Sequence, residues 1–197
     1  MEHVRDTPQS RKRNRAFSDL RGVIIDRSGI AATEFAMLLP IMALIFFGML
    51  EASDAMMTNR RVANAANSLV DLVGQETEVT SAQVESIFTG VQRMLEPTDS
   101  STLSMSLASV TRDPEDESKV IVEWSLDDMG EQPYAEGSEF TKLTDDTILL
   151  EGVSLIVAEL EYEYDSGLTS KVVGSPITFR KISTRWPRKS PSVVLTP

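Results

Sequence analysis

A single carboxylate, Glu34, lies at the start of an otherwise uncharged apolar stretch, and it is the residue whose position carries the clearest chemical consequence. The sixteen residues that follow it, residues 35–50, include no charged side chain. An acidic residue at the centre of a membrane span costs about 2.5 to 3.5 kcal/mol, so such residues usually have a function. Gly29 stands five residues before Glu34. Gly29 and Glu34 thus lie at the junction between a charged leader and an apolar helix.

Residues 30–50 are 21 residues long, which suits a helix that crosses a bilayer once. A plain signal anchor is one interpretation of this segment. A cleaved secretory signal is another, with Ser53-Asp54-Ala55 as a weak small-x-small site. The leader is long, the apolar run exceeds an ordinary signal core, and no helix breaker precedes that site. We therefore expect the segment to remain a transmembrane helix.

The leader is rich in basic side chains, whereas the rest of the chain is acidic. Residues 1–28 hold seven basic and four acidic residues, and residues 51–197 hold 12 basic and 25 acidic residues. Basic residues before a span favour a cytoplasmic N-terminus. We expect this topology signal from Arg11, Lys12, Arg13, Arg15, Arg21 and Arg27. The C-terminal part would then lie across the membrane, and its acidity argues against binding nucleic acid.

Composition also disfavours most enzyme classes. The chain has no cysteine, which excludes disulfides, thiolate metal sites and cysteine nucleophiles. Its one histidine, His3, lies in the charged leader, far from a plausible zinc site or catalytic triad. We therefore predict no enzymatic activity, no catalytic residue, no cofactor, no metal site and no small-molecule substrate.

Cleavage between Gly29 and Ile30 is a third interpretation of the N-terminal junction. It would remove the basic leader and free an amine on Ile30. Glu34 follows Ile30 by four residues, so the two positions share one helix face. Pro40 lies inside the span and lacks a backbone donor, which predicts a kink near residues 36–40.

The helix is predicted to continue beyond the span. Small and apolar residues recur at three- and four-residue steps between Ala52 and Val73, with Met56 among them, and Gly74 is a suitable C-terminal stop. The result would be one helix of about 45 residues. Its second half, residues 51–74, is expected to pack on a downstream sheet.

The N-terminal segment resembles the TadE-like family of tight adherence (Flp-type) pilus assembly proteins. The matching residues are Arg27-Ser28-Gly29-Ile30-Ala31-Ala32-Thr33-Glu34-Phe35-Ala36, Leu38-Leu39-Pro40 and Gly48-Met49-Leu50-Glu51. A second, distal similarity runs through residues 151–159 to Tyr162-Glu163-Tyr164. The first similarity spans about 25 residues and the second about 14, so the rest of the chain is outside both.

The resemblance implies a pseudopilin or minor pilin-like protein of the bacterial inner membrane. It implies cleavage after Gly29 by a prepilin peptidase, and partners among other pilin-like subunits and pilus assembly proteins. It also implies that Glu34, next to Phe35, meets the terminal amine of a neighbouring subunit and sets the helix register. The alternatives are an uncleaved single-pass scaffold of the pilus machinery and a secreted binding module. Incorporation into the pilus stays open.

The soluble part is predicted to be α+β. Thr80 and Gln83 form a capping box for a second helix that runs to about Glu96. Alternation then predicts strands near residues 103–109, 119–126, 153–165 and 177–185, with a hairpin connection at residues 113–116 and a turn at Ser166-Gly167 that returns through residues 171–173. Val120, Val122 and Trp124 are expected on one face. The sum is a helix packed on an antiparallel sheet of four to five strands.

The remaining segments carry less information. Residues 127–147 are acidic and are expected to form a surface excursion, with a short helical turn near residues 140–146. Its adjacent carboxylates, Asp127-Asp128 and Asp145-Asp146, resemble solvated loop charges more than catalytic pairs or calcium ligands. Glu159, Glu161 and Glu163 are expected on the wet face of the sheet, and Tyr162 and Tyr164 in the core. The tail is expected to be solvated, or else to dock a partner through Arg180, Lys181, Arg185, Arg188 and Lys189.

The predicted order of domains follows from these boundaries. Residues 1–29 form a basic cytoplasmic leader that is cleaved, residues 30–50 the transmembrane helix, and residues 51–74 its amphipathic continuation. Residues 75–186 form the periplasmic α+β domain, and residues 187–197 the tail.

Overall fold

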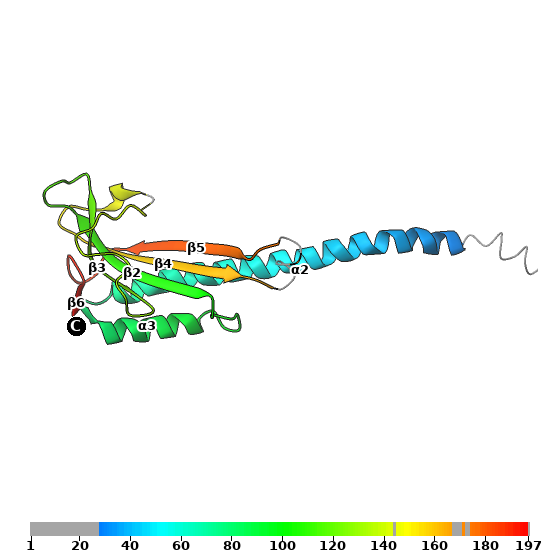
Figure 1. Ribbon diagram of the computed structural model, residues 1–197, viewed down its shortest axis with the longest axis horizontal. Coiled ribbons are helices and arrows are strands. Elements are labelled where there is room, and N and C mark those ends of the chain that lie inside the picture. The colour runs from blue at the N-terminus through cyan, green and yellow to red at the C-terminus, as the bar shows by residue number, and fades with distance from the viewer. Residues whose placement is uncertain (1–27, 144, 167–170, 172–173, 197) are drawn as a thin grey trace, which may run out of the picture. The chain divides into compact units, whose positions relative to one another are not determined.

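The computed structural model describes residues 28–143, 145–166, 171 and 174–196. The chain divides into two units, Met1–Leu50 and Glu51–Pro197. The first contains one apolar helical segment, and the second combines helices with a four-stranded antiparallel sheet (Figure 1). The predicted α+β class is confirmed. The predicted basic residues 11, 12, 13, 15, 21 and 27 lie outside the described residues, as do most of residues 167–173, where a turn and a return were predicted.

The helix α2 runs through Ser28–Val73, and Pro40 lies inside it. Its end is fixed by close backbone approach at Gly74, whose amide donates to the Val70 carbonyl at 2.9 Å. A Cβ at Gly74 would lie 3.0 Å from that carbonyl oxygen, so a side chain has little room there. Within the second unit, the buried face of α2 is made of small and β-branched residues and one leucine: Val62, Ala65, Ala66, Leu69, Val70 and Val73. Met56, which the periodicity placed on the same stripe, is exposed.

The helix α3 spans Ser81–Arg93 and begins with the predicted capping box. The Gln83 amide donates to the Thr80 hydroxyl at 3.2 Å, and the Thr80 amide donates to the Gln83 side chain at 2.8 Å. These bonds satisfy two amides that the first helical turn leaves without partners. The helix ends at Arg93, before the predicted end near Glu96, because a succession of turns follows Met94.

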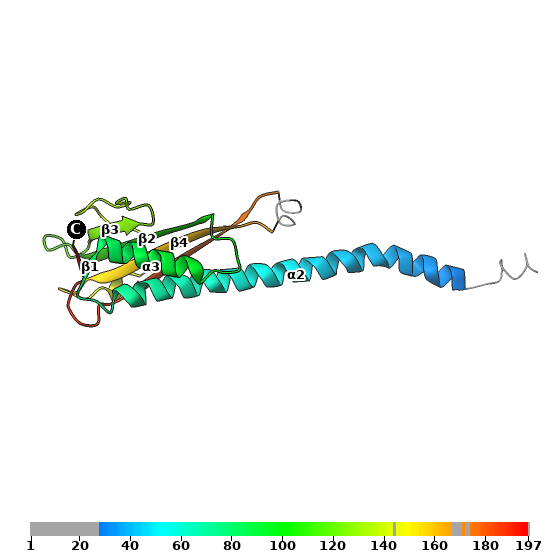
Figure 2. The ribbon, with the colours of Figure 1, turned by 90° about the horizontal axis from the view of Figure 1, so that it is seen from below.

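Four strands form the main sheet in the order β3-β2-β4-β5, with every neighbouring pair antiparallel. Their bounds are Leu103–Arg112 for β2, Val120–Asp127 for β3, Leu155–Tyr164 for β4 and Ile177–Arg185 for β5. The four strands predicted from alternation are all present. Figures 1 and 2 show α3 and the cyan part of α2 running alongside these strands.

The larger core lies between the sheet and the two helices. Leu107 and Leu160 of the sheet are fully buried there, together with Leu69 of α2 and Val84 of α3. Tyr162 and Tyr164 are buried in the same cluster, as predicted for these aromatic residues.

A smaller core covers one end of the opposite face of the sheet. Phe140 and Leu149, from the segment between β3 and β4, pack there against Val110, Val122 and Val157. The prediction of a surface excursion was therefore wrong for part of this segment, because its apolar residues cover sheet residues that would otherwise face water. Its short helix is a 3₁₀ turn at Asp146–Ile148, later than predicted.

A β-bulge in β3 sends neighbouring side chains to different cores. Trp124 pairs with Ser109, whereas Val122 pairs with Val110, so Glu123 is the additional residue. Val122 consequently packs in the smaller core and Trp124 against the larger one. The prediction that these two residues share a face was wrong, because the bulge breaks the alternation that it assumed.

The C-terminal segment is part of the fold. The strand β6, Val194–Thr196, pairs in parallel with β1, Glu78–Thr80, and forms a separate two-stranded sheet. Val193 is 1% exposed, and its carbonyl accepts the indole Nε1 of Trp124 at 2.7 Å. The predicted solvated tail is therefore wrong for this segment.

Candidate functional site

The N-terminal part of α2 exposes an apolar surface along its whole length. Side chains from Ile30 to Leu50 have no protein core to cover them: Phe35 is 57% exposed, Met37 77% and Leu44 72%. By length and composition this helix could cross a membrane, and none of its most apolar window is buried within the protein. Such a surface is stable only in another apolar environment.

Gly29 and Glu34 mark the charged end of this surface. Both belong to α2, and Glu34 is exposed. Glu34 follows Ile30 by four residues on a continuous helix, so their side chains project from the same side. A Cβ at Gly29 would meet nothing within 4 Å, so packing within the described chain does not require a glycine there. A requirement for glycine at position 29 would therefore have to come from a process outside the fold.

Local bonding around Glu34 is limited to its helix. The hydroxyl of Thr33 donates to the carbonyl of Ile30 at 2.8 Å. Such back-bonding is common for threonine within helices. Further along, Pro40 lacks the amide that would bond the Ala36 carbonyl. Figure 2 shows a bend in the blue part of α2. We retain the assignment of this bend to Pro40 as a prediction.

A second polar cluster lies on the face of the sheet opposite the helices. Lys142 Nζ donates to Glu159 Oε2 and to the Tyr134 hydroxyl, each at 2.7 Å, and that hydroxyl also donates to Glu159 at 2.7 Å. Burial alone would raise the pKa of Glu159, but hydrogen bonds from Lys142 and Tyr134 outweigh it and lower the pKa. Burial raises the pKa of Tyr134.

This cluster fastens the segment after β3 onto β4. The side chain of Glu159 is only 11% exposed, which contradicts the prediction that it lies on a wet face with Glu161 and Glu163. The physical reason is that the 127–154 segment covers this part of the strand. The arrangement resembles a structural latch, because every polar atom in it already has a partner.

The acidic loops use their carboxylates to organise turns. Asp127 accepts the amides of Met129 and Glu131, and Asp145 accepts the amide of Thr147. Asp116 accepts Ser118 and pairs with Lys119 at 3.1 Å. Among the residues that the structure describes, no group of three or more acidic or histidine side chains could hold a metal ion.

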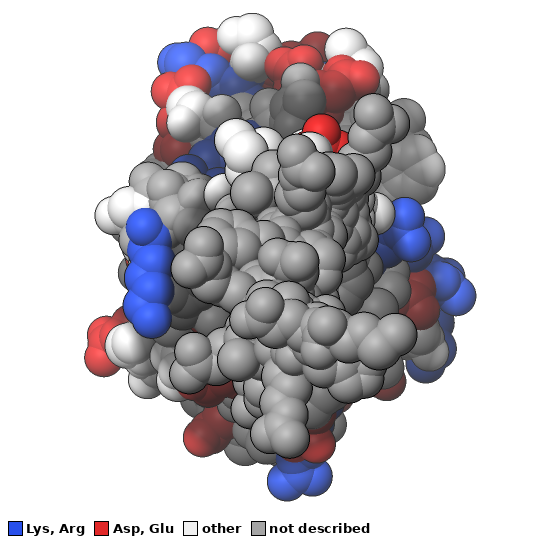
Figure 3. Space-filling view, turned by 90° about the vertical axis from the view of Figure 1, so that its right-hand side faces the viewer, with Lys and Arg blue, Asp and Glu red and all other residues white. Residues whose placement is uncertain are grey.

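The basic residues near the C-terminus pair with acidic residues of the helix and its following turn. Arg185 lies 3.5 Å from Asp71, Arg188 also pairs with Asp71, and Lys189 lies 3.9 Å from Glu76. On the face drawn in Figure 3, blue and red side chains are interspersed around the visible described surface. These pairs occupy much of the basic charge that the sequence suggested for docking a partner.

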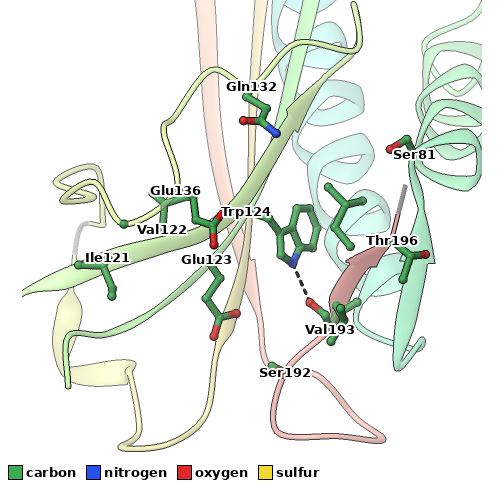
Figure 4. Close-up of a pocket in the computed structure, with 13 residues that line it drawn as sticks. Ser81, Ile121, Val122, Glu123, Trp124, Gln132, Glu136, Ser192, Val193 and Thr196 are labelled. Carbon is green, nitrogen blue, oxygen red and sulfur yellow. Dashed lines mark hydrogen bonds between the residues drawn. The ribbon is translucent and has the colours of Figure 1, made fainter.

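Sequence reasoning missed a groove between the outer edge of β3 and the C-terminal strand. Figure 4 shows Trp124 reaching from β3 toward Val193, with Gln132 and Glu136 beside the same space. The groove has a volume of about 750 Å³. Its walls come from segments about seventy positions apart in the chain, since Trp124 and Val193 are 69 residues apart. No residue type or spacing in the local sequence indicated this groove.

Comparison with known proteins bears on the N-terminal helix. The family model described as TadE, TadE-like protein, matches residues 29–69, which are most of α2. The match confirms the resemblance found from residues 27–51. No curated protein and no solved structure matches the chain.

Proposed function

We propose that this protein, which is TadE-like over residues 29–69, is a membrane-anchored minor pilin-like protein that serves the assembly of a tight adherence (Flp-type) pilus. The observation that carries the proposal is the exposed apolar surface of residues 30–50, with Glu34 as its only charge, inside the matched segment. In this proposal a prepilin peptidase cuts between Gly29 and Ile30. The second unit then stands in the periplasm of a bacterium, and the helix stays in the inner membrane.

The proposed role of Glu34 follows from the cost of its charge. A carboxylate next to lipid is costly alone, and so is the amine that cleavage would free on Ile30. A pair formed between adjacent subunits offsets both costs and favours one register between their helices. Glu34 thus promotes association of this helix with pilin-like subunits, and other pilus assembly proteins are further proposed partners.

An uncleaved scaffold is the second candidate. A helix that is long and apolar enough to span a membrane supports this role equally well. In a scaffold, the leader would stay attached and the amine at Ile30 would never form. Glu34 would then lack the partner that the first candidate assigns to it.

A substitution at Glu34 tests the proposed assembly role. We expect Glu34→Ala to abolish pilus assembly in cells while protein level and membrane fractionation stay normal. Thr33→Ala is the matched control, because the Thr33 hydroxyl bonds only within its own helix. Surface pili are measured by shearing and immunoblotting. Normal piliation of the Glu34→Ala strain would contradict the role of the carboxylate, and equal loss in both strains would point to a general defect of the helix.

A further inference from the structure

The strand β5 is an open edge of the main sheet. The strand order β3-β2-β4-β5 places it at one margin of the sheet, where it pairs only with β4 (Figure 1). The opposite margin is partly covered, because the Val122 amide of β3 donates to the Ser138 carbonyl and the Val122 carbonyl accepts the Gly137 amide. None of the nine residues of β5 is buried. The free edge of β5 is therefore accessible along its length.

The backbone groups of every second β5 residue point to this free edge. The Asp128 amide donates to the Met105 carbonyl at 3.1 Å, so Met105 of β2 directs its backbone groups toward β3. Leu160, which is opposite Met105, therefore directs its groups away from β2 and bonds Lys181 of β5. Backbone direction alternates along a strand, so the groups of the next residues on either side of Lys181 point outward. The outward residues are Thr178, Arg180, Ile182 and Thr184.

These outward groups have no backbone partner within the part of the chain that the structure describes. Such a row of unpaired amides and carbonyls can pair with a strand from another chain. The side chains on both sides of the row then decide which strand fits.

On one side, the edge runs next to α2. The Ser183 hydroxyl donates to Asn67 Oδ1 at 2.6 Å, and Arg185 lies 3.5 Å from Asp71. Four helix residues rise about 6 Å and two strand residues about 6.7 Å. The helix and the strand therefore advance together in one direction, and each earlier turn of α2 faces an earlier part of β5.

Two basic side chains on this side have no ion pair among the described residues. Lys181 precedes Ser183 on the same face of β5, and Arg60 and Asn64 precede Asn67 on the same stripe of α2. Asn64 thus lies beside Lys181, with Arg60 one turn earlier. The other basic residues of the C-terminal stretch do pair with acidic residues: Arg180, Arg185, Arg188 and Lys189. A carboxylate placed beyond the edge on this side would be attracted by both unpaired charges.

The other side of the edge is apolar at its centre. Ile182 is 38% exposed and belongs to the face of β5 that points away from α2. Thr178 and Thr184 share that face, and Arg180 is neutralised there by Glu161. β-branched residues opposite one another stabilise antiparallel strands. A strand that alternates acidic and β-branched residues would therefore complement both sides of the edge.

We propose that the free edge of β5 binds an extended, acidic segment of a partner protein, which adds a fifth strand to the main sheet. Main-chain bonds to the outward groups of β5 supply affinity, and carboxylates that pair with Lys181 and Arg60 supply specificity. A second copy of this chain fits less well, because two β5 strands side by side bring like charges together around Lys181. The site lies wholly in the second unit and does not depend on processing at Gly29.

Defined peptides test this proposal with the full-length protein in detergent micelles. The probe is a nine-residue, fluorescein-labelled peptide of alternating glutamate and valine, and its counterpart has lysine in place of glutamate. Fluorescence anisotropy measures binding of each peptide. We expect the glutamate peptide to bind saturably with a Kd below about 1 mM. The lysine peptide should bind at least about tenfold more weakly.

Backbone methylation distinguishes strand addition from simple charge attraction. One version of the glutamate peptide carries N-methyl groups on its valine amides, and another carries them on its glutamate amides. Only one of these two sets of amides can face β5, because backbone direction alternates along a strand. We expect one methylated peptide to bind at least about tenfold more weakly and the other to keep its affinity.

A proline at an outward position tests the edge from the side of the protein. Ile182→Pro removes an amide that points to the free edge, where proline is tolerated. We expect the circular dichroism of this variant to match wild type, while the glutamate peptide binds at least about tenfold more weakly. Ile182→Ala keeps the amide and is the matched control, with an expected loss of less than about threefold.

Paired charge variants test specificity. Lys181→Gln with Arg60→Gln should weaken binding of the glutamate peptide about fivefold. Lys119→Gln with Arg93→Gln removes the same charge from exposed positions on the β2–β3 turn and on α3, and should leave binding unchanged.

Any of five results would overturn the proposal. These are no saturable binding of the glutamate peptide, equal binding of the lysine peptide, equal affinities of the two methylated peptides, unchanged binding to folded Ile182→Pro, or equal weakening by the two pairs of charge variants. Self-association that the glutamate peptide reverses would replace the partner with a second copy of this chain. Each result leaves the proposed pilus role untouched, because that role is tested through Gly29 and Glu34.

Discussion

The two units of this protein contain apolar residues in opposite situations. In residues 30–50 the large apolar side chains are exposed, and Glu34 is the only charge. In the unit Glu51–Pro197 many large apolar side chains are buried in two cores, while 25 acidic residues are spread along the chain. The second unit provides its own apolar environment, and the first must receive one from outside.

The difference also explains the choice of secondary structure in each unit. A helix satisfies nearly all its backbone groups internally, which a lipid environment demands. The sheet of the second unit can leave edge groups to water, and β5 is an edge strand of the main sheet. In the proposed function, lipid and pilin helices surround the first unit and water surrounds the second.

Truncating one leucine in each unit should give the largest difference in stability between the two units. Leu69→Ala removes a fully buried side chain from the larger core and should lower the free energy of unfolding by about 2 to 5 kcal/mol. Leu44→Ala, at an exposed position of the first unit, should change it by less than about 0.5 kcal/mol. Urea unfolding of the full chain in micelles, followed by tryptophan fluorescence, measures both values. Similar losses would contradict the assignment of the folded core to the second unit.

Adding a charge at an exposed apolar residue should affect membrane insertion in the first unit but not in the second. Leu44→Arg places a charge within the apolar helix and should disfavour membrane insertion by about 2.5 to 3.5 kcal/mol. Met129→Arg, at a residue that is 83% exposed in the second unit, should leave insertion unchanged. Alkaline extraction of isolated membranes reports the inserted fraction. Full retention of the Leu44→Arg protein in membranes would count against a spanning role for this helix.

The latch on the sheet predicts a pH dependence that belongs to the second unit alone. Since the folded-state pKa of Glu159 is lowered from its ordinary value of 4.5, its ionised form stabilises the fold above that pH. This contribution, about 1 kcal/mol, is lost as the pH falls through the lowered pKa. Glu159→Gln should therefore reduce stability near neutral pH, and the difference from wild type should shrink in acid.

Lys142→Met provides the companion measurement for the latch, because it removes the donor that contacts both Glu159 and Tyr134. It should reduce the same acid-dependent difference. A difference that stays constant from neutral pH into acid, for either variant, would show that ionisation of Glu159 contributes nothing.

The smallest effect is expected where the C-terminal segment is tied to α2. Asp71→Asn weakens partly exposed ion pairs with Arg185 and Arg188 and should cost up to about 1 kcal/mol. Added salt should reduce this cost. A limited-proteolysis time course, with Glu85→Gln as control, should show faster cleavage near residues 186–192 in the variant. Unchanged protection at low salt would mean that β6 pairing alone holds the segment.

Features set by neighbours in sequence were predictable. The capping box of Thr80 and Gln83 needs only residues three apart, and the strands follow from alternation within each segment. The end of α2 before Gly74 was likewise predictable from a residue type at one position. In each case the physical cause acts within a turn or a strand.

Features set by distant residues were missed. The bulge at Glu123 shifts register between two paired strands, and no local pattern around Val120 to Trp124 indicates it. The burial of Glu159 depends on Lys142 and Tyr134 from another segment. The C-terminal strand is only three residues long, and its pairing with β1 is visible only in the folded chain. The groove lies between β3 and residues 192–196, which are distant in sequence, so it could not be predicted from local patterns.

Two glycines of α2, Gly29 and Gly48, can be compared in their surroundings. Gly29 and Gly48 lie in the same helix, and a Cβ at either meets nothing within 4 Å. Packing within the described chain therefore gives no reason to prefer glycine at one position over the other. A specific requirement at Gly29 would have to come from an enzyme that recognises it.

Processing at Gly29 is tested by the intact mass of the membrane-extracted protein, from cells with and without the prepilin peptidase. We expect loss of residues 1–29 only when the peptidase is present. We also expect Gly29→Leu to block this loss, while Gly48→Leu, the matched substitution in the same helix, should not. A full-length mass in both strains would exclude the processed pilin-like role and favour an uncleaved scaffold.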